Sequence, residues 1–595
     1  MFLRQHSRFK DGKDHIYWSL METVRTDNGP RQRLLCYLGE LNSSQNKSWR
    51  KIVSVFNKEG EEEQLALFPS DIAPEEDSED IVKIDLKSVK LERAREFGTV
   101  YVGLELWKRL ELDIFWKNKI DTETENLTCR PVDIPRSEVA AILAINRLCD
   151  PVSELAIEEE WYKGTALDDL LNITEDKIHT DRLYECLDCL IKHKEELEKH
   201  LKARYGELFE IKYDIVLYDL TSTYFEGMAE KNPQAQRGYS RDHRPDCKQV
   251  CIALVVNEEG FPLAYEVFDG NRADVTTLEE IIETVEKKYG KSRRIWIFDR
   301  GIVSEENLEM LRKKEMQYLV GTRRGELKRY EEKLLDDNWQ KVRKDVEVKL
   351  VQADKEEETF VLCRSGKRGE KEKAMRVGAS KKLECGLLKL AVRIETGKIK
   401  DRNKMERKIG ALLGRYASVS DLYTVEIKDN KLFWCIDKNK IEWCKAREGA
   451  YLIRTNIKET DPVKMWEKYI QLTEAEAAFR TLKSELVIRP IWHQKEKRVQ
   501  AHIMVAFMGY ALWVTLKRLL KDAGSEYSPA KALSILKRIH SGDIVMRTAG
   551  DGKKYEIRLR RIFYLDKEQN EILDALKISL PDKISFDLKQ NVVQT

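Results

Sequence analysis

Three acidic residues are the strongest candidates for chemistry in this sequence. Asp219 lies inside the apolar run IVLYDL, Asp299 ends the apolar run RRIWIFD, and Glu476 follows in a helical pattern 177 residues later. A carboxylate within an apolar strand is costly unless it is paired, hydrogen-bonded or bound to a metal. Either aspartate taken alone is better explained as a turn former or a strand-end cap. The three together form a site hypothesis.

Three carboxylates that meet in space could hold two divalent metal ions about 3.5–4 Å apart. One ion would activate a water molecule or a 3′-hydroxyl, and the other would stabilise the leaving oxygen of an in-line displacement at phosphorus. Carboxylates suit Mg²⁺, which accepts few protein ligands and keeps several waters. We therefore expect two Mg²⁺ ions per site, with Mn²⁺ able to substitute, and both catalytic and metal-binding roles for Asp219, Asp299 and Glu476.

The segment KMWEKYIQLTEAEAAFRTLKSEL places Tyr469, Glu476 and Lys483 seven residues apart in turn. In one α-helix, each step of seven returns to within about 20° of the same face and lies about 10 Å further along. Lys483 would then lie where a phosphate passes. Taken alone, the pattern is that of an ordinary amphipathic helix with a solvated face.

Basic residues near these acids are candidates for contact with DNA. Arg300 directly follows Asp299 and could equally be a turn residue, and Arg480 could simply pair with Glu476 four residues before it. A solvated face explains the polar stretch after the helix nearly as well as phosphate contacts do. The predicted DNA-binding residues are Lys483, Tyr469, Arg480, Arg300, Arg489, Lys497 and Arg498.

The elements that must position these residues predict an α/β fold. Short β-rich runs and one helical stretch give three strands, a helix and two more strands, which indicates a mixed sheet flanked by helices. We predict a β-hairpin region at 1–58, an acidic linker at 59–88, a helical region at 89–205, the first part of the core at 206–329, a β-rich inserted subdomain at 330–457, and the rest of the core with the C-terminal region at 458–595.

The composition excludes several classes of protein. With 106 Lys and Arg against 104 Asp and Glu, the net charge of +2 gives no global positive field, so DNA binding must depend on local clusters. No run approaches the ~20 apolar residues of a membrane span. Eleven scattered cysteines and an N-terminus without an apolar core predict a cytoplasmic location. Cys186 and Cys189 have no second cysteine pair with which to bind zinc. The sequence has no phosphate-binding Gly-x4-Gly-Lys loop, so ATP binding is not implied.

The chain resembles the bacterial insertion-sequence transposases of the DDE superfamily. The group it most resembles carries Tyr-x2-Arg-x3-Glu-x6-Lys, which here reads Tyr469, Leu472, Glu476 and Lys483, with Leu in place of Arg. The segments YDLTSTYFEG, FDGNRAD, IFDRG and FRTLKSELVIRPIWHQKEKRVQAHI also match this group, and the resemblance covers most of residues 206–520. It implies an RNase H-like core with an insertion before the helix that bears the glutamate.

The resemblance also implies a function. Such a protein binds the terminal inverted repeats of its element, cleaves DNA with two divalent metal ions, and transfers the 3′-OH ends into target DNA. It implies a homodimer on DNA in the bacterial cytoplasm, associated with the nucleoid, and we assign end recognition and assembly to residues 1–205. The rival hypotheses are an RNase H-like nuclease without strand transfer and an inactive, transposase-derived DNA-binding protein.

Some relatives form a hairpin on the transposon end by means of an aromatic residue of the insertion. Trp434 and Trp443 are the candidates here, although tryptophan in a β-rich segment is more often a core residue. Leu472 removes a phosphate contact of the family signature, so the sequence does not decide between the hairpin pathway and another cleavage pathway. The terminal repeat, the target site, the oligomeric state without DNA and the mobility of the element also stay open.

Overall fold

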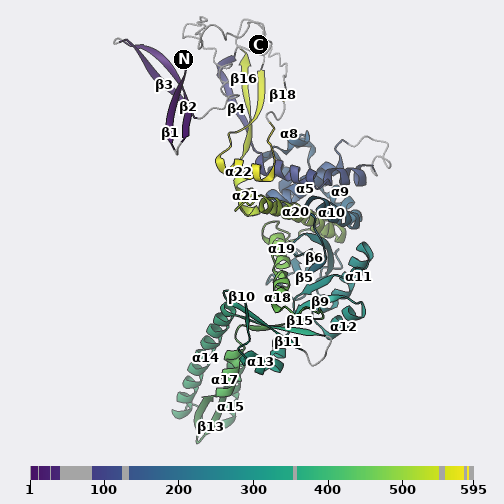
Figure 1. Cartoon of the computed structure of the whole chain (residues 1–595), viewed down its shortest axis with the longest axis vertical. Coiled ribbons are helices and arrows are strands. Elements are labelled where there is room, and N and C mark those ends of the chain that lie inside the picture. The colour runs from purple at the N-terminus through teal and green to yellow at the C-terminus, as the bar shows by residue number, and fades with distance from the viewer. Residues whose placement is uncertain are drawn as a thin grey trace. The chain divides into compact units, whose positions relative to one another are not determined.

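A computed structural model describes residues 2–10, 13–26, 29–39, 84–122, 133–352, 358–548, 556–581 and 586–587. Within these ranges the chain forms two compact units (Figure 1). The first unit comprises residues 1–94, 541–562 and 581–595. The second comprises residues 95–540 and 563–580. All predicted site residues belong to the second unit.

The described residues of the first unit form two β-sheets. The strands β1 (Phe2–Lys10), β2 (Lys13–Thr26) and β3 (Gly29–Gly39) form one sheet, in which the predicted hairpin is β2–β3. The other sheet has the order β18-β17-β16-β4, with bounds β4 Ile84–Glu96, β16 His540–Thr548, β17 Glu556–Ile562 and β18 Phe586–Asp587. The strand β4 covers positions where we predicted the end of a linker and the start of helices. Its partner β16 lies some 450 residues away in sequence, so no local pattern predicts the pairing. The rest of the predicted linker lies outside the described residues.

The second unit is built on a mixed sheet whose described strands have the order β10-β11-β12-β15-β9-β8-β5-β6-β7. Five of these strands form the core: β5 (Ile215–Tyr224), β6 (Gln249–Asn257), β7 (Pro262–Asp269), β8 (Ile295–Phe298) and β9 (Gln317–Gly321). The first three are antiparallel to one another, whereas β8 is parallel to both β5 and β9. This arrangement confirms the predicted strands and the RNase H-like fold class.

The helix α11 (Leu278–Tyr289) separates β7 from β8, as predicted, and α12 (Glu305–Lys313) makes the connection from β8 to β9. A parallel pair needs such a crossover. The helices α18 (Pro462–Ile470) and α19 (Leu472–Ser484) return to the sheet, and α19 packs against β5 and β6.

The insertion is less separate from the core than we predicted. Its strands β10 (Gln340–Arg343), β11 (Val346–Gln352), β12 (Thr359–Ser365) and β15 (Ala450–Thr455) extend the core sheet, because β15 pairs with β9. Pairing in this way covers an edge of β9 that would otherwise expose unsatisfied backbone groups. The rest of the insertion is mainly helical, and its elements lie next to one another around an apolar cluster of their own (Figure 1). These elements are α14 Gly366–Glu395, α15 Arg402–Arg415, α16 Ala417–Ser420, β13 Tyr423–Lys428, β14 Lys431–Ile436 and α17 Lys438–Ala446.

Helices before and after the core pack together. The long helix α20 (Glu496–Asp522) lies against α5 (Arg136–Cys149) and α9 (Thr180–Leu190). By length and composition α20 could cross a membrane, which our reading of apolar runs missed, but 94% of its apolar window is buried inside the protein, as in a core helix. The other α-helices of the described residues are α2 Gly98–Arg109, α3 Leu112–Trp116, α6 Glu154–Ala156, α7 Tyr162–Gly164, α8 Leu167–Leu171, α10 Lys194–Phe209, α13 Glu331–Leu335, α21 Pro529–Leu536 and α22 Lys567–Leu576.

Candidate active site

The two aspartates come together through the register of neighbouring strands. Residues 215–218 of β5 pair in parallel with residues 295–298 of β8, one to one. Asp219 and Asp299 are the next residue on each strand, so they lie side by side where β8 ends. Adjacent strands are about 4.8 Å apart, and register neighbours project from the same face of the sheet. The sheet therefore places both carboxylates on one face.

The helix α19 supplies the third acid. Its buried residues Leu472, Ala475, Phe479 and Leu482 recur at three- and four-residue spacing and face the sheet, whereas Glu476 is exposed. The preceding helix α18 starts at Pro462, where the Asp461 carboxylate accepts a hydrogen bond of 2.9 Å from the backbone N–H of Val463. The segment that we predicted as one helix forms two helices, α18 and α19, because a turn at Gln471 separates Tyr469 from Glu476.

The three carboxylates act on one another electrostatically. Burial raises the pKa of Asp219 to about 7, and the negative charges of Asp299 and Glu476 contribute to the rise. A backbone hydrogen bond from Leu220 at 2.8 Å and the charge of Arg241 oppose it only in part. Within the described part of the chain, the side chains of Asp299 and Glu476 make no hydrogen bond or ion pair. The cluster thus holds negative charge that the positive charge of Arg241 offsets only in part.

This donor set fits divalent metal. Hard cations prefer carboxylate oxygen, and a metal ion removes the repulsion that raises the pKa of Asp219. The three carboxylates do not converge as tightly as a single-ion cluster, in which all ligand atoms would lie within 4.8 Å of one another. A pair of ions about 3.5–4 Å apart spreads its ligands more widely. Asp219, Asp299 and Glu476 are the residues that would hold them.

The predicted DNA-binding residues fall into two groups. Lys483 and Arg489 both contact the buried carboxylate of Asp242, with 2.8 Å between Lys483 Nζ and Asp242 Oδ1. Arg498 pairs with Asp188 at 2.9 Å and lies over the ring of Tyr184, so its charge is used within the protein.

Arg300, Arg480 and Lys497 are exposed. Arg480 forms no ion pair with Glu476 in the described structure, contrary to the pairing that we considered. Arg300 lies directly beside Asp299 at the end of β8. These three side chains keep their charge available to a ligand.

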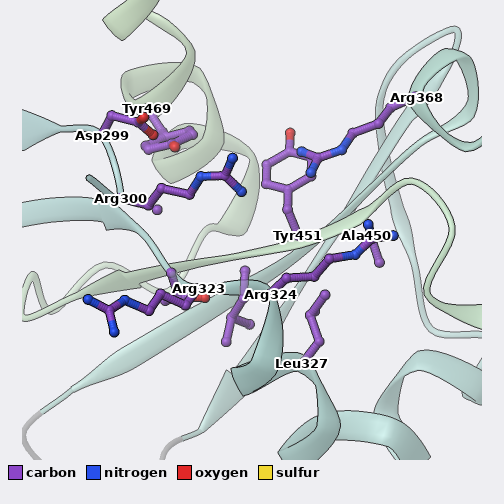
Figure 2. Close-up of a pocket in the computed structure, with 12 residues that line it drawn as sticks. Asp299, Arg300, Arg323, Arg324, Leu327, Arg368, Ala450, Tyr451 and Tyr469 are labelled. Atoms are coloured by element: carbon purple, nitrogen blue, oxygen red, sulfur yellow. The ribbon is translucent and has the colours of Figure 1, made fainter. Parts of the chain in front are cut away.

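A cavity of about 320 Å³ adjoins Asp299 on the side of the insertion. Arginines dominate its described lining, since Arg300, Arg323, Arg324 and Arg368 face one lining carboxylate, that of Asp299. Figure 2 shows Arg300 and Arg368 reaching into this space from opposite sides, with Arg300 beside Tyr469 and Arg368 over the ring of Tyr451. The Glu372 carboxylate offsets part of the charge, at 2.8 Å from Arg324 and 3.1 Å from Arg368. We call this space the arginine pocket.

Three of these arginines were missed by the sequence interpretation. Arg323 and Arg324 directly follow the strand MQYLVGT, and a basic pair at the end of a core strand was a usable signal. Arg368 had no such signal, because its position depends on the pairing of β12 with β15 and of β15 with β9.

Tyr469, which we predicted as a DNA-binding residue, also lines the arginine pocket. Burial and the charge of Asp299 raise the pKa of Tyr469 above its usual value, so the hydroxyl stays protonated. Gly321 permits its approach, since a Cβ at that position would lie 2.5 Å from the Tyr469 oxygen. Leu472, at the position of the signature arginine, is buried against the sheet and offers no phosphate contact.

The tryptophans proposed for base stacking are half-buried and pack against apolar clusters. Trp434 lies against the apolar cluster of the insertion, and Trp443 lies against a second cluster that includes Leu327 and Leu452. Neither lines the arginine pocket. Their contacts favour the structural interpretation.

A second acid-containing cluster lies away from the three carboxylates. Glu154, His493 and His502 are buried, with their ligand atoms within 4.8 Å of one another. Nε2 of His493 lies 3.2 Å from the Glu154 carboxylate, and His502 accepts from Arg147 at 3.2 Å and donates to the Ile488 carbonyl at 3.1 Å. Burial holds the pKa of His502 far below its usual value. Because both ring nitrogens of His502 have partners, this cluster links helices and is a poor metal site.

The comparison with known families agrees with this geometry. The family described as "Transposase DDE domain" matches residues 211–512, more than half of the chain. The chain belongs to this family. Membership implies nuclease or transposition chemistry, and the family generally uses a divalent metal.

Among solved structures, the chain is similar to the cryo-EM structure of the piggyBac transposase synaptic complex with hairpin DNA. The identity is 9% and the TM-score is 0.35, over 74% of this chain and 79% of the other. No curated protein is similar enough in sequence to count as a match.

Proposed function

We propose that this protein is a DNA transposase that cuts phosphodiester bonds at the terminal inverted repeats of an insertion sequence and joins the freed 3′-OH ends to target DNA. The observation that carries the proposal is the convergence of Asp219, Asp299 and Glu476. Burial and the charges of the other two acids raise the pKa of Asp219, and Arg241 offsets that rise only in part. The arginine pocket beside Asp299 provides the complementary positive charge.

In this proposal Asp219, Asp299 and Glu476 would together hold the two Mg²⁺ ions. The bound ions would supply a metal-activated nucleophile and charge stabilisation at the leaving oxygen. The protein's own task is to bind and orient the scissile phosphate, which is the main source of catalysis in phosphoryl transfer. Mn²⁺ should replace Mg²⁺, because both take carboxylate ligands.

The arginine pocket would hold DNA backbone near the scissile bond. Guanidinium groups bind phosphate oxygens through two parallel hydrogen bonds. Arg323, Arg324 and Arg368 would supply contacts that the family signature assigns to the residue at position 472, where this chain has a buried leucine. The hydroxyl of Tyr469 is a donor to the same phosphate.

The substitution Asp299→Asn tests the proposal. It keeps the shape of the side chain and removes one ligand charge, so binding to the terminal repeat should persist while Mg²⁺-dependent nicking is lost. The control is Glu309→Gln, an exposed acid on α12, which should nick normally. Near-normal nicking by Asp299→Asn would refute the assignment of the site.

Strand transfer is tested separately. Pre-cut ends incubated with supercoiled plasmid and Mg²⁺ should give joined products. Cleavage without joining would leave the RNase H-like nuclease as the function, and binding without either would leave the inactive DNA-binding protein.

We assign recognition of the terminal repeats and assembly to residues 1–205, with a homodimer on paired ends in the cytoplasm, associated with the nucleoid. Photo-crosslinks from labelled repeat DNA to the full chain should map to this region. Light scattering should give two chains per pair of ends. Crosslinks confined to residues beyond 205 would contradict the assignment.

A further inference from the structure

The loop between β5 and β6 carries a buried carboxylate that the mechanism above does not use. The side chain of Asp242 is 3% exposed, and its Oδ1 accepts from both Lys483 and Arg489. Its other oxygen, Oδ2, is buried without a hydrogen-bond partner among the described residues. A buried acid with an unused acceptor is unusual in a purely structural role, because it lacks the full set of partners that normally offsets burial.

The charges around Asp242 do not balance. One carboxylate faces two cations, and the side chains of Lys483 and Arg489 are only 12% and 30% exposed. Burial lowers the pKa of Lys483, as do the charges of Arg489 and Arg241, while Asp242 opposes this. Arg241 is itself paired, at 2.5 Å from Asp274. The cluster therefore holds one excess positive charge, which an anion would neutralise.

The loop is tied to the strand that bears the first acid. The backbone N–H of Arg241 donates to Ser222 Oγ at 3.2 Å, and Ser222 is fully buried on β5, three residues after Asp219. The charge of Arg241 also acts on Asp219 and lowers its pKa. At the other side of the loop, Lys483 lies on α19 seven residues after Glu476. Asp242 thus connects the strand of one acid to the helix of another.

We propose that Asp242 is a positioning residue that holds Lys483 and Arg489 as a paired clamp for one phosphodiester of the DNA substrate, at a fixed place relative to the three acids. This inference rests on the proposed function. The phosphate supplies the negative charge that the cluster lacks. Asp242 acts through the two cations and touches neither DNA nor metal.

The substitution Asp242→Asn distinguishes the positioning of Lys483 and Arg489 from nonspecific electrostatic attraction of DNA. It removes a negative charge, so binding to a labelled duplex without divalent metal should be unchanged or tighter. Because the cations are then no longer held in place, nicking at saturating DNA and Mg²⁺ should slow at least tenfold. The matched control is Asp246→Asn in the same loop, where an exposed carboxylate pairs with Arg244 at 2.9 Å, and both readouts should stay near wild type.

Other outcomes overturn the inference. Faster nicking with tighter binding would show that Asp242 restrains the cations instead of orienting them. Equal loss of binding and nicking would show a structural role alone. If Asp242→Asn does not fold, Ser222→Ala takes its place, because it loosens the loop without changing charge. It should slow nicking and leave binding intact, and wild-type nicking by it would refute the positioning role.

A double-mutant test keeps the clamp separate from the catalytic proposal. Each phosphate contact contributes about 0.9 to the slope of log affinity against log salt. Lys483→Ala should lower that slope by about 0.9 in the wild-type chain and by much less in the Asp242→Asn background. An equal fall in both backgrounds would refute the clamp. If the wild-type chain binds but never nicks with Mg²⁺, the proposed function fails, and this binding test still decides the inference.

Discussion

Two clusters of ionisable side chains in the same unit have opposite electrostatic character. Around Glu154 the acid is surrounded by His493, His502 and Arg147, and these partners lower the pKa of Glu154 although burial opposes its charge. Around Asp219 the neighbours Asp299 and Glu476 are also acids. Burial and their charges raise the pKa of Asp219 to about 7, although Arg241 opposes the rise. In the first cluster, partners within the protein compensate the carboxylate charge. The second cluster carries negative charge that a bound cation would neutralise. The difference indicates that charge left uncompensated by the fold marks the site of function.

The largest expected effect is on catalysis at the uncompensated cluster. Asp219→Asn should reduce metal-dependent nicking by about 10³-fold or more, because it removes a central metal ligand. It should not lower the melting temperature in the absence of Mg²⁺, since the variant removes a buried charge repelled by two other acids. A nicking assay and a thermal melt of the same preparation measure both. A variant that is destabilised but still nicks DNA would contradict this account, because it would give the three acids a structural role and no catalytic role.

The matched change at the compensated cluster should have the opposite result. Glu154→Gln leaves the buried charge of Arg147 without its acidic partner, which should cost about 3 kcal/mol of stability. Nicking per folded molecule should stay near that of the wild type. Chemical denaturation gives the stability, and active-site titration with labelled ends gives the folded fraction. Loss of nicking in fully folded protein would make this cluster part of the active site.

The pH dependence should sharpen the comparison. The folded, metal-free site holds a proton on Asp219 up to about pH 7, so Mg²⁺ must displace that proton when it binds. Nicking at subsaturating Mg²⁺ should therefore rise between about pH 6 and pH 8, and saturating Mg²⁺ should move the midpoint lower. The raised pKa also predicts that this group destabilises the metal-free fold as pH rises from 3.8 towards 7. A midpoint that does not respond to Mg²⁺ would contradict this assignment.

The smallest expected effect is at the arginine pocket. Arg368→Ala should weaken DNA binding by about 1 kcal/mol, roughly fivefold, and lower the salt slope by about 0.9. The control is Lys389→Ala, which removes the same charge from an exposed position of the same helix, α14. Fluorescence anisotropy over a range of salt concentrations gives both quantities. If the two variants weaken DNA binding equally, the contribution of Arg368 is nonspecific electrostatic attraction and not a contact in the arginine pocket.

The sequence predicted the elements that carry the three acids, since Asp219 and Asp299 end apolar runs and Glu476 lies in a helical pattern. Each acid alone had an ordinary explanation, and the parallel register of β5 and β8 is what brings the two aspartates together. The succession of core strands along the chain followed from the β-rich runs. Arg368 could not be assigned to the arginine pocket from the sequence, since it reaches the pocket only through strands that pair across the insertion. For the same reason the sequence did not reveal that Asp188 uses the charge of Arg498 or that Asp242 holds Lys483. Local patterns show which residues need partners, whereas only the folded chain shows which partners they have.

The most direct test is the location of bound metal. Anomalous diffraction from crystals of the full chain grown with Mn²⁺ should show two peaks about 3.5–4 Å apart between Asp219, Asp299 and Glu476, and none between Glu154, His493 and His502. A peak at the histidine cluster, or none at the three acids in crystals that contain cleaved DNA, would contradict the account.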